Sequence, residues 1–172
     1  MKHTLVATME NQPAVFNRVL SLFRCRGFAV ESLAIGHTEI PNIMRLTIVV
    51  DGSKTAVEQV VKQLYKIIEV RKVSDVPEDE TVRRELALIK VASKPSTRSE
   101  IIQLVDIYRA RIVDVATNSL IVEVTGTPDK VDSMINVLRG FGIKEMVRTG
   151  VVAMVRGQQV AYEGDKVREL SA

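Results

Sequence analysis

The order of strand-like and helix-like patterns along this chain occurs twice, and this repetition constrains the fold more than any single residue does. In each half, an apolar strand pattern is followed by an amphipathic helix, two further strands, a second amphipathic helix and a last strand. Apolar residues recur at every second position in strands and at every third or fourth position in helices, so the two patterns are distinguishable. The sequence therefore predicts two consecutive βαββαβ units of about 75 residues each.

The first unit is expected within residues 1–76. Its first helix begins at Pro13, because proline suits the first helical turn, and its second helix follows the turn at 51–53. The apolar positions at helical spacing are Phe16, Val19, Leu20, Phe23, Val57, Val60, Val61 and Leu64. The four strands of this unit are expected at residues 4–9, 30–38, 43–51 and 67–73.

The second unit is expected within residues 84–160, after an acidic linker at 77–83 that contains a proline, and a polar tail follows at 161–172. Residues 97–100, Thr-Arg-Ser-Glu, match a capping box at the start of its first helix. The apolar stripes of its helices are Ile101, Leu104, Val105 and Tyr108, then Val131, Met134, Ile135 and Leu138. Its strands are expected at residues 84–92, 111–116, 119–125 and 143–155.

Two βαββαβ units predict the α+β class, with two ferredoxin-like domains. In each domain a four-stranded antiparallel sheet carries both helices on one face, and the apolar helix stripes bury that face. The opposite face is then left open. Residues 4–9 do not alternate cleanly between apolar and polar side chains, so we expect this open face to be covered by another domain or subunit.

The composition excludes several classes of function. The chain of 172 residues has a net charge of +3, two histidines, one cysteine and no tryptophan, which leaves little material for a metal site or a histidine-based catalytic set. The charge is too small for a polyanion partner, and the central strands lack the aromatic residues on which nucleic-acid bases stack. Nucleic acid is therefore not an expected partner. The sequence has no apolar run of about 18 residues and no signal-peptide pattern, so a membrane is not an expected partner either, and the cytoplasm is the expected location.

Two residues with reactive side chains are better explained by packing or surface roles. Cys25 lies near the end of a predicted helix, where the helix dipole disfavours a thiolate, so it is expected to act as a small hydrophobic residue. His37 lies on a predicted strand and is expected to be a surface or interface histidine rather than a ligand.

The turn at Asn11-Gln12-Pro13-Ala14-Val15 is the most informative candidate site. It joins a strand to a helix whose first amides have no partner within the helix, and these amides suit a carboxylate. The Asn11 side chain adds an amide donor and acceptor for the head group of an amino acid. From the spacing alone, ordinary helix capping without a ligand is the favoured explanation of this turn.

Several segments together resemble a known family. They lie at residues 11–13, 18–19, 22–23, 26–28, 31–33, 45–48, 63–70, 84–91, 148–152 and 156–157. In this order they are similar to the small, regulatory subunit of acetohydroxyacid synthase, also called acetolactate synthase. The resemblance identifies the first domain, 1–76, as an ACT domain for effector binding and dimerisation.

The resemblance implies a protein without activity or cofactors of its own. Such a subunit binds and activates a catalytic subunit that carries thiamine diphosphate, Mg and FAD, and it confers feedback control by valine or another branched-chain amino acid. ACT domains of this type form homodimers through their second strands. The effector then lies between Asn11, Gln12, Pro13, Ala14 and Val15 of one chain and Ala29 and Val30 of the other.

Two residues depart from the family pattern, which commonly has glycine in place of Ala14 and asparagine in place of Ala29. The Ala14 methyl group limits the approach of a ligand to the backbone, and Ala29 lacks an amide that could bind it. Losing a hydrogen bond to a charged group costs about 1.5–3 kcal/mol, which is about tenfold or more in affinity. We therefore expect weak valine binding or a preference for another effector.

Two other functional classes remain as alternatives. One is a free-standing ACT-domain sensor that regulates another enzyme or a transcription factor; the second half of the chain, with Arg148-Thr149-Gly150, argues against it. The other is a small enzyme on a ferredoxin-like fold, such as an acyl-phosphate hydrolase. That reaction requires an arginine-containing anion loop after a first strand, and neither half has one.

Overall fold

The computed structural model describes residues 2–26 and 29–157. Contacts within the chain divide these residues into two units. The first unit contains the described residues through Val82 and those from Val151 onward, and the second unit is Arg83–Gly150. The predicted tail at 161–172, the side chain of Cys25 and the expected helix end at Gly27 lie outside the described residues.

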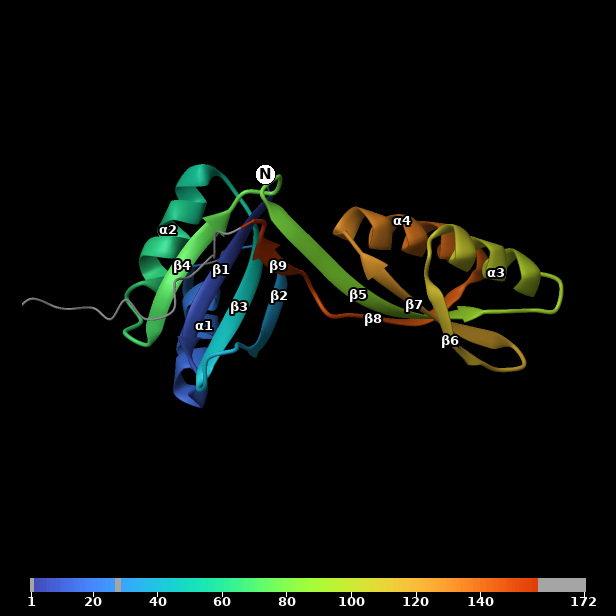
Figure 1. Ribbon diagram of the computed structural model, residues 1–172, viewed down its shortest axis with the longest axis horizontal. Helices are drawn as coiled ribbons and strands as arrows, with labels where there is room; N and C mark the ends of the chain where they lie inside the picture. Colours follow the sequence, from blue (N-terminus) through green and yellow to red (C-terminus); the bar gives the residue numbers. More distant parts are fainter. Residues whose placement is uncertain (1, 27–28, 158–172) are drawn as a thin grey trace, which may run out of the picture. The chain divides into compact units, whose positions relative to one another are not determined.

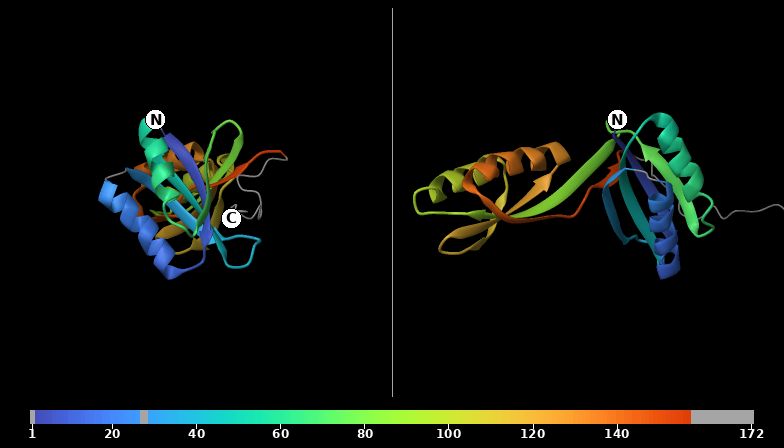
Figure 2. Two further views of the ribbon diagram at one scale, coloured as in Figure 1. Left: turned by 90° about the vertical axis from the view of Figure 1, so that its left-hand side faces the viewer. Right: turned by 180° about the vertical axis from the view of Figure 1, so that it is seen from behind.

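The first unit has a four-stranded antiparallel sheet in the order β2-β3-β1-β4 (Figure 1). Helices α1 and α2 both cover one face of this sheet. The right-hand view of Figure 2 shows this unit from behind. The elements are β1 (Lys2–Glu10), α1 (Pro13–Arg26), β2 (Val30–His37), β3 (Ile43–Asp51), α2 (Lys54–Leu64) and β4 (Val70–Val76).

Most residues of the predicted apolar stripes form the core of this unit, but Leu20 is 39% exposed and Phe16 is only partly buried. In α1, Val15, Val19 and Phe23 are buried at intervals of four residues, which places them on one helix face against the sheet. Helix α2 begins at Ser53, whose side chain accepts a hydrogen bond from the amide of Ala56 at 3.3 Å. The core also contains Leu5, Ala7, Met9, Leu46, Ile48, Val50, Val57, Val60, Leu64, Ile67, Val70 and Val73.

The second unit repeats the same arrangement, with strand order β6-β7-β5-β8 and both helices packed on one face. The two sheets thus have the same relative order of strands, which confirms the α+β class with two ferredoxin-like βαββαβ domains. The elements are β5 (Thr81–Ala92), α3 (Arg98–Ile107), β6 (Arg111–Val115), β7 (Ser119–Gly126), α4 (Pro128–Leu138), the short 3₁₀ helix η1 (Arg139–Phe141) and β8 (Ile143–Arg148).

The capping box predicted at 97–100 is wrong. The Thr97 side chain forms no cap hydrogen bond with α3. Its hydroxyl instead accepts a hydrogen bond from the amide of Lys94 at 3.2 Å and donates to the Lys94 carbonyl at 3.3 Å. The residue therefore closes the loop before the helix, because hydroxyl side chains readily bond to nearby backbone groups in turns.

The ends of the second unit differ from the sequence expectation. Strand β5 begins at Thr81, so part of the expected linker 77–83 is strand. The single strand expected at 143–155 is two strands, β8 and β9 (Val152–Val155), separated at Gly150, whose φ of 80° interrupts the extended backbone. Strand β9 belongs to the first unit and pairs with β5, whose residues Thr81 and Val82 lie in that unit too.

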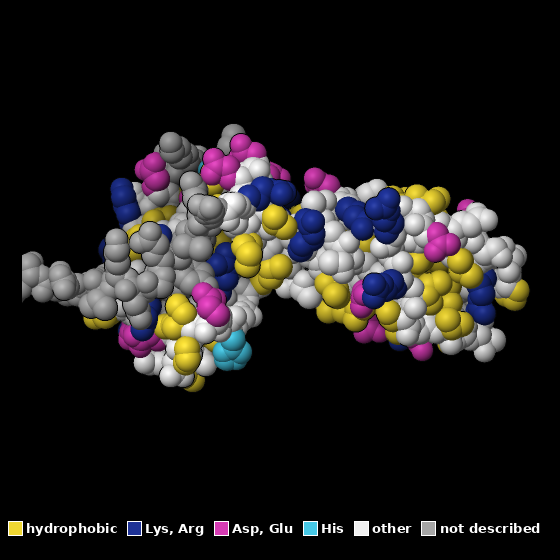
Figure 3. Space-filling model, in the orientation of Figure 1, with side chains coloured by type: hydrophobic (Ala, Val, Ile, Leu, Met, Phe, Trp, Pro, Cys, Tyr) yellow, Lys and Arg dark blue, Asp and Glu magenta, His cyan; other side chains and the backbone are white. Residues whose placement is uncertain are grey.

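The first sheet is also buried on the face opposite its helices. Val6 and Val76 on this face pack against Ala153 and Val155 of β9. Part of the face that we expected to find a partner is therefore covered by the chain's own β9. Around β6 of the second unit, by contrast, hydrophobic side chains lie at the surface (Figure 3), and Val115 is 63% exposed. No helix in residues 2–26 and 29–157 has the length and hydropathy needed to cross a bilayer.

Candidate functional site

The turn that contains Asn11 lies at one end of the first sheet, beside two other connections. The amide of Asn11 donates to the carbonyl of Asn42, in the β2–β3 turn, at 2.8 Å. The amide of Glu10 donates to the carbonyl of Glu69, in the α2–β4 connection, at 3.1 Å. Three loops that are far apart in the sequence thus meet at this end, and they hold the turn in place.

Most backbone amides of the turn already have acceptors. The amide of Gln12 donates to the Glu10 carbonyl at 2.9 Å, and those of Val15 and Phe16 donate to the Gln12 carbonyl. Pro13 has no N–H group. Within the described structure, the amide of Ala14 has no such backbone acceptor. The turn therefore offers an anion this amide and the exposed side chain of Asn11, rather than the several free amides expected from the sequence.

Side-chain exposure separates the predicted site residues into two groups. Asn11, Gln12, Pro13 and Ala14 are exposed and accessible to a ligand. Val15 is completely buried in the core of the first unit. Its side chain therefore holds the helix on the sheet, and a ligand has access only to the exposed part of the turn.

Charged side chains surround the turn, and sequence reasoning missed them. Arg18 donates a hydrogen bond to the carboxylate of Glu69, and this bond lowers the pKa of the Glu69 carboxyl below its ordinary value. Glu10 accepts a hydrogen bond from the side chain of Gln12 at 3.0 Å and lies 3.9 Å from a guanidinium nitrogen of Arg71. The βαββαβ order provided the available signal, because it places the start of the fourth strand beside the end of the first.

Ala29 and Val30 lie at the opposite end of the same sheet. Val30 pairs with Val50, near the end of β3, and the Ala29 carbonyl accepts a hydrogen bond from the amide of Asp51 at 3.2 Å. The Asn11 turn follows Glu10, which pairs with Ile43 at the start of β3. At about 3.3 Å per residue, Ile43 and Val50 are about 23 Å apart along β3. One chain therefore does not bring the two predicted halves of the site together.

Strand β2 is an edge of the first sheet. Within the described structure it pairs with β3 alone, and its residues from Ile35 to His37 are exposed. His37 lies opposite Met44, and Met44 in turn lies opposite Met9 of β1. The last residues of β2 are thus at the same end of the sheet as Asn11. Among the described residues, no group of three or more His, Cys, Asp or Glu side chains is placed to hold a metal ion.

A partly buried charge cluster lies in the second unit. Arg148 donates to both oxygens of the Glu85 carboxylate, at 2.7 and 2.6 Å, and to Asp132 of α4 at 2.7 Å. The Glu85 side chain is only 4% exposed, so its charge requires this partner. The two carboxylates raise the pKa of Arg148 above its ordinary value, which keeps the guanidinium charged. The cluster fixes the end of β8 against β5 and α4.

Known proteins resemble this chain over nearly its whole length. Residues 5–72 match the family described as the AHAS small subunit-like ACT domain, and residues 84–157 match the small subunit of acetolactate synthase. A probable acetolactate synthase small subunit of Archaeoglobus fulgidus is 54% identical over 92% of this chain and 99% of the relative.

Two further relatives agree with this. The acetolactate synthase small subunit of Bacillus subtilis is 44% identical over 96% of this chain and 97% of its own length. The crystal structure of the acetolactate synthase small subunit from Thermotoga maritima superposes with a TM-score of 0.86 at 40% identity, covering 92% of this chain and 99% of that one.

Proposed function

Because this chain belongs to the family of acetolactate synthase small subunits, we propose that it is a non-catalytic regulatory subunit of that enzyme. It binds the catalytic subunit, raises its activity and makes it sensitive to a branched-chain amino acid, with valine as the first candidate. Thiamine diphosphate, Mg and FAD belong to the catalytic subunit, and the complex works in the cytoplasm.

Membership of this family over nearly the whole chain carries the proposal. For the effector site, the relevant geometry is the separation of its two predicted halves at opposite ends of one sheet. A ligand the size of an amino acid does not span about 23 Å. The site is therefore completed by a second copy of the chain. A symmetric dimer supplies the missing half because its twofold axis gives each copy the same surface of the other.

The open edge of β2 provides the geometry of that dimer. In an antiparallel pair of β2 strands related by a twofold axis, the start of one strand lies opposite the end of the other. Val30 of the partner subunit then lies near His37, at the end of the sheet where Asn11 is found. This pairing joins two four-stranded sheets into one sheet of eight strands and removes an exposed edge.

The exposed turn supplies the chemistry that recognises the effector. The Ala14 amide and the Asn11 side chain bind the carboxylate, while the backbone at Ala29 and Val30 of the partner subunit closes the site. The methyl group of Ala14 lies beside the only turn amide without a backbone acceptor in the described structure. It therefore restricts the ligand at that contact, and we expect weak valine binding or another preferred effector.

Reconstitution with the catalytic subunit tests the regulatory role. The full chain is mixed with a purified thiamine-dependent acetolactate synthase catalytic subunit from the same source, and complex formation and acetolactate output are measured. Co-elution with increased turnover is expected. Absence of both at micromolar concentrations would contradict the proposal and favour the alternative, a free-standing ACT-domain sensor that regulates another enzyme or a transcription factor.

The variant Asn11→Ala separates effector binding from activation. Feedback requires that the effector favour one arrangement of the complex over another, and Asn11 contacts the effector in this proposal. The variant should lose feedback inhibition and retain activation of the catalytic subunit. Equal loss of both would show that the effector and partner sites are not separable.

A further inference from the structure

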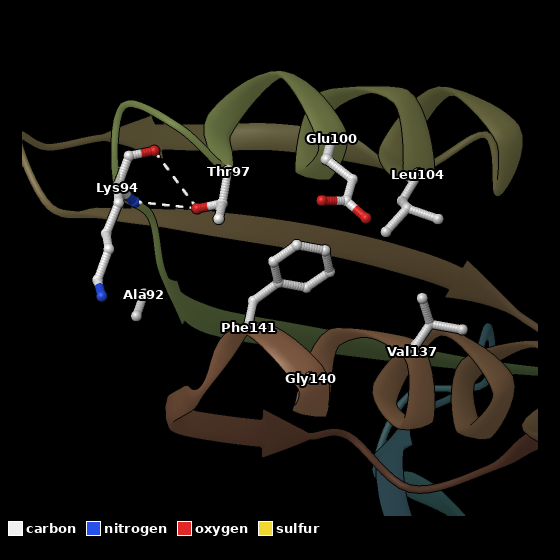
Figure 4. Close-up of a pocket in the computed structure, with 8 residues that line it drawn as sticks. All are labelled: Ala92, Lys94, Thr97, Glu100, Leu104, Val137, Gly140 and Phe141. Carbon is white, nitrogen blue, oxygen red and sulfur yellow. Dashed lines mark hydrogen bonds between the residues drawn. The ribbon is translucent and has the colours of Figure 1, made fainter.

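The second unit contains a hollow between α3 and α4 that the regulatory role does not use. Its volume is about 610 Å³, within the range of about 300–1,000 Å³ typical of small-molecule sites. It lies beside the loop between β5 and α3, which contributes Lys94 and Thr97 (Figure 4). The residues that line it are Ala92, Lys94, Thr97, Glu100, Leu104, Val137, Gly140 and Phe141.

One part of the hollow is apolar. Figure 4 shows Leu104 of α3 and Val137 of α4 facing each other across it. Val137 is 38% exposed, although it lies in the last turn of a helix whose other apolar residues are buried. A ligand with an aliphatic side chain would cover this surface and gain the free energy of removing it from water.

The next part of the hollow favours a cation. The carboxylate of Glu100 points toward Phe141 (Figure 4). Among the described residues, no ion-pair partner is found for Glu100. The face of an aromatic ring carries partial negative charge, so it attracts a cation and repels a carboxylate. An ammonium group placed between Glu100 and Phe141 would be attracted by the carboxylate, and by the ring wherever it contacts the ring face.

The loop end of the hollow offers the opposite charge. Lys94 lies there beside Ala92 (Figure 4), and its ammonium group has no ion-pair partner among the described residues either. The Thr97 hydroxyl is already bonded to the backbone of Lys94, so it fixes the loop rather than binding a ligand. The lining thus carries one anion and one cation around an apolar surface, which matches a zwitterion with an aliphatic side chain.

We propose that this hollow binds an α-amino acid with an aliphatic side chain. The ammonium group lies between Glu100 and Phe141, the side chain packs on Leu104 and Val137, and the carboxylate points toward Lys94. The hollow follows the first strand of the second unit, just as the Asn11 turn follows the first strand of the first unit. It differs from that turn because all of its lining residues come from one unit of one chain, so binding does not require a dimer.

Amide NMR of the full chain with L-leucine as the probe tests this proposal. We expect saturable shifts at residues 92–104 and 137–141. Two analogues test the two charges: 4-methyl-2-oxopentanoate lacks the ammonium group, and 3-methylbutylamine lacks the carboxylate. Each should bind at least tenfold more weakly than leucine, since each loses an interaction with a charged group.

Matched variants locate the site. Glu100→Gln should weaken leucine binding at residues 92–104 at least tenfold, whereas Asp106→Asn, an exposed acid on the same helix outside the hollow, should leave it unchanged. Asn11→Ala should also leave these shifts unchanged, which distinguishes the hollow from the proposed effector site. Shifts confined to the Asn11 turn, or equal affinity in Glu100→Gln and the unmodified chain, would overturn the proposal.

Discussion

The side chain of Ser32 accepts a hydrogen bond from the amide of Val151 at 2.8 Å, across 119 positions of the sequence. Ser32 lies on β2, the edge that we propose pairs in the dimer, and Val151 immediately precedes β9. A guanidinium nitrogen of Arg45, on β3, donates to the carbonyl of Ala153 within β9. Hydrogen bonds with β2 and β3 therefore hold the segment after Gly150 directly. A substitution or a shift of β2 that breaks the Ser32 contact would loosen this segment.

The variant Ser32→Ala should destabilise the first unit by about 1–3 kcal/mol, because it leaves the amide of the buried residue Val151 without its acceptor. Urea unfolding followed by circular dichroism measures the change. Ser96→Ala, at an exposed serine without a side-chain hydrogen bond among the described residues, is the control and should change stability little. Equal effects in the two variants would contradict the role of the Ser32 contact.

Replacing Arg148 by methionine should destabilise the second unit by about 3 kcal/mol. The change leaves the nearly buried carboxylate of Glu85 without its cation, and an unpaired buried charge is costly. Thermal or urea unfolding measures the loss. Arg139→Met, at an exposed arginine in η1, is the control. It makes the same substitution without breaking an ion pair among the described residues, so it should change stability little. A double variant, Arg148→Met with Glu85→Leu, should recover part of the lost stability.

The Arg18–Glu69 pair should make stability depend on pH in the acid range. The pKa of Glu69 is lower in the folded protein than the ordinary value of 4.5, so the pair stabilises the folded state above that pH. The contribution is lost as the pH falls through the lowered pKa, because the protonated carboxyl no longer pairs with Arg18. The stability difference between the unmodified chain and Glu69→Gln should therefore shrink between pH 5 and pH 3. A difference that is constant over this range would contradict the ion pair.

Restoring the family residues should strengthen valine binding. Ala29→Asn adds an amide next to the proposed effector and should lower the dissociation constant for valine about tenfold or more. Ala14→Gly removes the methyl group that restricts access to the turn and should add to the effect. Isothermal titration calorimetry on the full chain measures both. Micromolar valine affinity in the unmodified chain would refute the expectation of weak binding.

A charge on the exposed edge should prevent the proposed dimer. Ile35 on β2 is 38% exposed, and Ile35→Lys places a charge that opposes pairing of two such edges. Sedimentation equilibrium should give a folded monomer for this variant and a dimer for the unmodified chain. Val113→Lys, on the exposed strand β6, serves as the comparison and should remain dimeric. A dimer in both variants would place the interface elsewhere.

The local periodicity of the sequence was sufficient to predict both βαββαβ units and their core. Val19 and Phe23 of the predicted stripe lie in the core, where Val15 joins them and Leu20 does not, and the apolar residues that alternate along β3 face the helices. These features follow from short-range spacing because a helix or strand has only one apolar face to bury. The turn at Asn11 was found in the same way, through its proline and the helix that follows.

The tertiary structure alone decided the features that depend on long-range contacts. The pairing of Arg18 with Glu69, the return of β9 to the first unit and the opposite placement of Asn11 and Ala29 each join or separate residues far apart in the chain. The sequence predicted one strand at residues 143–155, whereas the structure has two. Apolar alternation indicates that a segment is a buried strand, but it does not identify the sheet to which the strand belongs. The sequence by itself thus determined the two domains, and the packing of distant segments decided that one chain holds only half of its proposed effector site.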